Sequence, residues 1–152
     1  LFLHFLYLHF IMNMAALLLL GARLEHLFGR IKFLLIYFLA GFGSLLVYFL
    51  IALSDQVNRS VPLMGASGCI MGLVGALVAV VFQGWRKNRG SAQRSRLLLI
   101  LFVIGFQILF DLSTPEVSFS VHFSGLIIGF TVQTIFQLLE GKKKSGKNRE
   151  SA

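Results

Sequence analysis

The sequence predicts an all-α membrane protein that crosses the bilayer several times, and three observations support this prediction. Hydrophobic residues make up 57% of the 152 residues and charged residues only 13%, about half the share that is usual in soluble domains. A soluble domain of this size could not bury so much apolar surface, because small globules leave much of their surface exposed. The charged residues also fall into a few clusters, which leaves five long stretches between them almost free of charge.

The five stretches have the length of membrane-spanning helices. A spanning helix needs about 20 residues, and lipid-facing strands are excluded because the backbone must satisfy its own hydrogen bonds inside lipid. We place the spans near residues 4–22, 33–53, 64–84, 97–113 and 118–139. The connecting segments 54–63 and 84–96 are predicted to be loops. We divide the chain into a membrane domain over residues 1–140 and a basic tail over 141–152, which we expect to be disordered.

The basic residues predict the orientation in the membrane. All 14 Lys and Arg residues except Arg59 lie after the first span, between the third and fourth, or after the fifth. This places them on one side of a five-span layout, the cytoplasmic side by the positive-inside rule. The net charge of +8 is then explained by topology and by contact with anionic lipids, so no nucleic acid is expected as a partner. With the N-terminus outside, and Leu1 already in a hydrophobic run, we expect a further span upstream.

Two of the spans carry stripes of glycine at helical spacing. Such flat stripes let two helix backbones approach closely, so we expect the third and fifth spans to pack together. The third span carries Gly65, Gly68, Gly72 and Gly75, and the fifth carries Gly125 and Gly129.

A serine and a histidine lie within these two stripes. Close packing of the spans would bring the Ser67 hydroxyl within hydrogen-bond reach of His122, and a serine beside a histidine is the minimal activated nucleophile. No third member of a triad is evident, because Asp111 lies near an outer boundary. The alternative interpretation is a packing seam, which explains the glycines but has no particular need for Ser67.

The first span also holds polar residues that are costly in lipid. His9 and Asn13 are four residues apart and share one helix face. Hydrogen bonding between helices is the alternative explanation. Asn13 is deeper in its span than Ser67 and His122 are in theirs, so we expect the first helix to start later or to run past Arg23 toward Gly29.

Together these residues resemble the rhomboid family of intramembrane serine proteases. The resemblance rests on HFIMN from His9 to Asn13, GASG from Gly65 to Gly68 and VHFSGLIIG from Val121 to Gly129, in that order on three helices. It implies a rhomboid-like helical bundle in which the five spans are helices two to six of a six-helix core.

The resemblance also implies roles for individual residues. Ser67 would be the nucleophile and His122 the general base, with an oxyanion hole formed by His9, Asn13 and the backbone N–H of Ser67. Gly65 would allow close approach of the backbone, and no cofactor or metal would be needed.

The function expected on this basis is an endopeptidase that cleaves transmembrane or membrane-proximal segments near the outer face. Its partners would be transmembrane protein substrates and membrane lipids, and its location a bacterial inner membrane. Two alternatives remain at this point: a non-catalytic rhomboid-like protein that binds membrane helices, and an unrelated small transporter.

Overall fold

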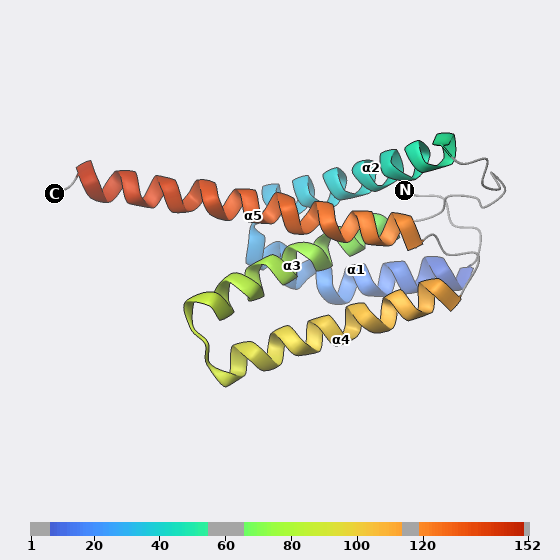
Figure 1. Ribbon diagram of the computed structural model, residues 1–152, viewed down its shortest axis with the longest axis horizontal. Coiled ribbons are helices and arrows are strands. Elements are labelled where there is room, and N and C mark those ends of the chain that lie inside the picture. The colour runs from blue at the N-terminus through green and yellow to red at the C-terminus, as the bar shows by residue number, and fades with distance from the viewer. Residues whose placement is uncertain (1–6, 55–65, 114–118, 151–152) are drawn as a thin grey trace.

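Five helices account for nearly all of the chain that the computed structural model describes, which is residues 7–54, 66–113 and 119–150 (Figure 1). No strand occurs within these ranges, which confirms the all-α fold class. The helices are α1 (Tyr7–Phe28), α2 (Arg30–Ser54), α3 (Ser67–Lys87), α4 (Ser91–Ser113) and α5 (Phe119–Glu150).

Four of the described helices are long and apolar enough to cross a membrane. Their candidate spans are Arg30–Leu53, Ser67–Lys87, Ser91–Leu109 and Phe119–Lys142, which match the second to fifth predicted spans. The first predicted span corresponds to α1, whose role as a span remains a prediction. As the depth of Asn13 suggested, α1 continues past Arg23 and ends at Phe28.

Two segments predicted to be irregular are largely helical, so the predicted bounds of the inner loop and the predicted disorder of the tail were wrong; only residues 88–90 of that loop are not helical. Instead of a loop over 84–96, α3 runs to Lys87 and α4 begins at Ser91. Instead of a disordered tail, α5 continues to Glu150. Both corrections have one physical reason: a helix already formed in the membrane extends without a new nucleation cost, and Lys, Arg, Gln and Glu are good helix formers. The predicted outer loop over 54–63 lies, apart from Ser54, outside the described residues.

Helix α3 is the centre of the bundle. It contacts each of the other four described helices and packs most extensively on α5 and α2. Half of its span is buried, against 6% for α4, which lies at the edge of the bundle. Residues at the start of α3 are therefore enclosed by protein rather than by lipid.

The basic residues gather at one end of the bundle. Figure 1 shows the starts of α1 and α5 and the ends of α2 and α4 at one end, and the α1–α2 turn and the α3–α4 connection at the other. The final turns of α5 project beyond the bundle at this second end (Figure 1). The described Lys and Arg residues all belong to helix ends or connections on that side, as the alternating layout of spans requires.

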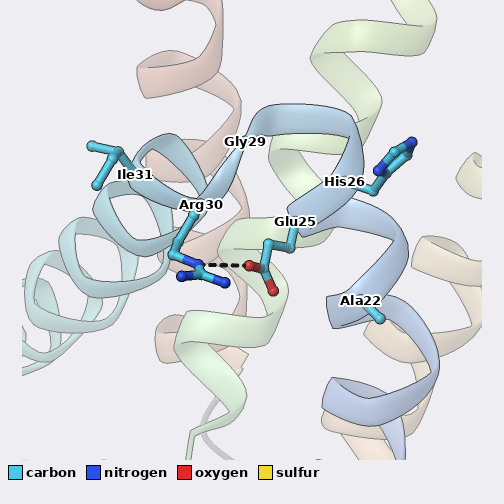
Figure 2. A pocket seen from close by; sticks show the side chains of 6 residues that line it. All are labelled: Ala22, Glu25, His26, Gly29, Arg30 and Ile31. Carbon is cyan, nitrogen blue, oxygen red and sulfur yellow. Dashed lines mark hydrogen bonds and ion pairs between the residues drawn. The ribbon is translucent and has the colours of Figure 1, made fainter.

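The turn between α1 and α2 needs a single residue. Gly29 has a φ of +80°, a left-handed conformation that glycine adopts without steric cost. Its N–H donates to the carbonyl of Glu25 at 2.8 Å, and its own carbonyl accepts from Phe33 N–H at 3.0 Å. Figure 2 shows the Arg30 guanidinium reaching across this turn to Glu25, with 3.1 Å between Nε and Oε1.

A second ion pair links α2 to α5 at the same end. Lys32 Nζ pairs with Glu140 Oε1, and it also lies 5.9 Å from the centre of the Phe136 ring. Glu25 and Glu140 are thus each paired with a basic residue, and most of the cationic side chains that the structure describes are exposed.

Candidate active site

The glycine stripes of α3 and α5 bring the two helix backbones into direct contact. A Cβ atom added to Gly125 would overlap the carbonyl oxygen of Gly68, and one added to Gly129 would overlap that of Gly72. From the first contact to the second, the contacting residue advances by four positions on both helices, from Gly68 to Gly72 and from Gly125 to Gly129. The helices α3 and α5 are therefore parallel, with their starts at the same end. A seam this close exists only because neither helix carries side chains along it.

Ser67 and His122 flank the first contact of this seam. Ser67 is the first residue of α3, and His122 lies near the start of α5. A Cβ on Gly68, the residue after Ser67, would be 3.0 Å from Cγ1 of Val121, the residue before His122. Both polar side chains are buried, with 9% of Ser67 and 6% of His122 exposed. The structure therefore brings together the two helix segments that carry the predicted pair.

The backbone at Ser67 is suited to binding negative charge. Ala66 caps α3 without a side-chain hydrogen bond to the first turn, and the first intrahelical bond of that turn runs from Ile70 N–H to the Ala66 carbonyl at 3.0 Å. The N–H groups of Ser67 and Gly68 have no acceptor within the helix because of their position. These groups carry the partial positive charge of the helix start.

The structure describes only some of the residues predicted to form the oxyanion hole. Asn13 is buried on α1, with 8% of it exposed, and α1 packs against α3 and α2 but makes no contact with α5 among the described residues. The backbone of His9 belongs to the same helix, whereas its side chain, and the whole of Gly65, lie outside the described residues.

Two buried polar residues were missed by the sequence analysis. Ser44 on α2 is completely buried, and Gln133 on α5 is 6% exposed. Both lie in membrane spans, so the rule that polar residues in membrane segments are costly could have singled them out. The glycines around Ser44, at positions 41 and 43, were a further signal of close helix contact.

The hollow at the α1–α2 turn is separate from this site. Figure 2 shows it lined by Ala22, Glu25, His26, Gly29, Arg30 and Ile31. It lies at the basic end of the bundle, whereas Ser67 and His122 lie toward the opposite ends of their helices. Within the described ranges, no group of three or more His, Cys, Asp or Glu side chains could hold a metal ion.

Comparison with known proteins decides the family. The family model of the Rhomboid domain matches residues 1–138. The chain belongs to the rhomboid family. This membership overturns the alternative of an unrelated transporter, and it agrees with the apolar helices in making the chain an integral membrane protein.

Three curated rhomboid relatives illustrate the range of the family. RHOMBOID-like protein 6, mitochondrial, of Arabidopsis thaliana is 37% identical over 122 residues, which cover 80% of this chain and 37% of that protein. Rhomboid protease GluP of Bacillus subtilis (strain 168) is 32% identical over 122 residues, covering 80% of this chain and 22% of GluP. Inactive RHOMBOID-like protein 8 of Arabidopsis thaliana is 25% identical over 101 residues, covering 66% of this chain and 27% of that protein.

The comparisons therefore place this rhomboid chain in a family with both active and inactive members. The chain spans less than half the length of the curated relatives that it matches. No solved structure matches it significantly.

Proposed function

We propose that this rhomboid chain is the core of an intramembrane serine endopeptidase, with Ser67 as nucleophile and His122 as general base. The observation that supports this most is the burial of both side chains beside the contact between Gly68 of α3 and Val121 of α5. A serine and a histidine buried on two helices whose backbones touch can form a nucleophile and base pair with little freedom to separate.

The chemistry follows from the residue types. His122 would take the proton of the Ser67 hydroxyl as its oxygen attacks the peptide carbonyl, and would return that proton to the departing amine. The negative charge that develops on the carbonyl oxygen would be met by the Ser67 N–H and by the side chains of Asn13 and His9. A water molecule, activated by the same histidine, would then release the acyl group from Ser67.

The position of the pair along the bundle determines where substrates would be cut. Ser67 begins α3, and Arg86 lies 19 residues further on, roughly 28 Å along the helix. Water and substrate would therefore reach the pair from the end opposite the basic residues. With the basic end and the C-terminus in the cytoplasm, cleavage would occur near the outer face and release the outer part of the substrate.

The substrates we propose are single transmembrane segments of other proteins. A helical peptide keeps its carbonyl groups in hydrogen bonds, so the segment must unwind before attack. Small or helix-breaking residues near the cut are therefore expected. The mapped cut site in a single-span substrate of known orientation tests this topology, and a cut at the cytoplasmic boundary would contradict it.

An activity-based probe tests the catalytic pair. A fluorophosphonate should label the full-length protein at Ser67, and Ser67→Ala and His122→Ala should each abolish both labelling and cleavage of a reporter. Because residues that act as a unit lose activity non-additively, the double variant should be no worse than either single variant. Cleavage by Ser67→Ala at a near wild-type rate would exclude this mechanism.

A non-catalytic protein that binds membrane helices is the second candidate. It is favoured by the similarity to a relative whose name describes it as inactive. It predicts helix binding without labelling of Ser67, so the same probe separates the two functions. The bacterial inner membrane remains a prediction, since the three relatives above come from a plant and a bacterium.

A further inference from the structure

Three helices meet at Gly68, the residue that follows Ser67. On one side lies Ser44 of α2, which is completely buried. A Cβ atom added to Gly68 would be 2.5 Å from the Ser44 Oγ and 3.0 Å from Cγ1 of Val121, which precedes His122. Ser44 therefore touches the turn that carries the proposed nucleophile, next to the segment that carries the proposed base.

The hydroxyl of Ser44 is held in one orientation. Its Oγ donates to the carbonyl oxygen of Gly41 at 2.9 Å, which uses its only proton. The oxygen then presents lone pairs to Gly68, where a Cα hydrogen stands in the place of a side chain. Contacts between a Cα–H group and an oxygen recur at close helix interfaces and are weakly favourable.

The turn at Gly68 has no room to yield if Ser44 is enlarged. Gly68 has no side chain that could move aside, and on its other face its carbonyl oxygen lies against Gly125 of α5. Any atom added at position 44 in the direction of α3 must therefore displace the α3 backbone itself. The displaced segment is the first turn of α3, which begins with Ser67.

We infer that Ser44 is a positioning residue for the proposed reaction, because it sets the distance between α2 and the first turn of α3 and so aligns Ser67 with His122. This inference rests on the proposed function. A misplacement of about 1 Å in a catalytic group can cost about 10²-fold in rate. The effect should therefore fall on the chemical step rather than on the binding of substrate.

The test compares Ser44→Val with Ala79→Val in the full-length protein. Ala79 is 2% exposed, and it lies on α3 about 18 Å beyond Ser67 at 1.5 Å per residue, so its substitution overpacks the same helix away from the site. The measurements are kcat and KM on a single-span reporter, the rate of fluorophosphonate labelling of Ser67, and the unfolding temperature. Ser44→Val should lower kcat and the labelling rate by about 10²-fold with KM unchanged. Ala79→Val should lower only the unfolding temperature.

Two further substitutions keep the inference testable if Ser44→Val does not fold. Ser44→Ala removes the oxygen without adding bulk, and Ser44→Thr keeps the oxygen and adds one methyl group. Ser44→Thr should then have the lower kcat of the two. A wild-type kcat in Ser44→Thr, or a loss confined to KM or to stability, would overturn the inference.

The same measurements separate this inference from the proposed function. If the wild-type protein is labelled at Ser67 and the Ser44 variants are labelled equally fast, only the positioning role of Ser44 is wrong. If the wild-type protein is not labelled at Ser67, the proposed function is wrong and the positioning role falls with it.

Discussion

Replacement of Gly129 by alanine should destabilise the bundle far more than one added methyl group usually does. The new Cβ atom would lie 2.5 Å from the carbonyl carbon of Gly72 and 2.6 Å from its Cα. Ordinary van der Waals contact begins at 3.4 Å, so α3 and α5 would have to move apart by at least about 0.9 Å, the difference between 3.4 and 2.5 Å, and further to clear the carbonyl oxygen of Gly72, which the new Cβ atom would overlap. Both neighbouring atoms are backbone, which cannot rotate away as a side chain can.

The expected cost follows from this geometry. Overpacking of a tight interior costs about 1–3 kcal/mol, and a clash with backbone places Gly129→Ala near the upper value. For a chain of this length, about 3 kcal/mol corresponds to a fall of about 6–12 °C in unfolding temperature. Gly72→Leu and Gly125→Leu add larger side chains to the same seam and should damage both folding and activity.

Gly105→Ala is the matched control, because a Cβ atom on Gly105 of α4 would have nothing within 4 Å. This variant should be unchanged or more stable by up to about 1 kcal/mol, since alanine has the higher helix propensity. Thermal unfolding in detergent, followed by circular dichroism, measures both variants. Equal unfolding temperatures for Gly129→Ala and Gly105→Ala would refute the contact between the α3 and α5 backbones.

Two further predictions concern buried polar groups. Gln133→Leu should raise the free energy of unfolding by about 1–3 kcal/mol, because the buried Gln133 Oε1 has no hydrogen-bond partner in the described part of the chain and such a group carries its full desolvation cost. The control is Gln137→Leu, one turn further along α5, where the side chain is only half-buried. An unfolding temperature that falls in Gln133→Leu alone would contradict this reasoning. If the Asn13 amide binds the oxyanion, Asn13→Ala should lower kcat by about 10²–10³-fold with a small change in KM. Steady-state cleavage of a reporter measures both constants. An effect confined to KM would instead indicate a role in substrate binding.

Much of the fold was determined by the sequence alone, because the bilayer imposes simple rules. Spans must be helical, must be about 20 residues long and must exclude most charges, so the positions of charge in this chain were enough to place α2, α3, α4 and α5. The ends of the helices were predicted less accurately than the spans. Lys87 and Glu150 end helices that continue past the apolar stretch, since helix extension into water depends on propensity and an existing nucleus rather than on hydropathy.

The candidate site shows the same division. Ser67 and His122 stood out in the sequence, because polar residues within glycine stripes are conspicuous in apolar spans. The packing of α3 on α5 was expected from their glycine stripes and is confirmed by the structure. The register that sets Gly68 against Gly125 depends on contacts between residues more than 50 positions apart, and no local pattern specifies that register. The place of Ser44 beside Gly68 was decided only by the tertiary structure, because a serine near glycines indicates a close helix contact but does not specify which helix, or which turn of it, the serine meets.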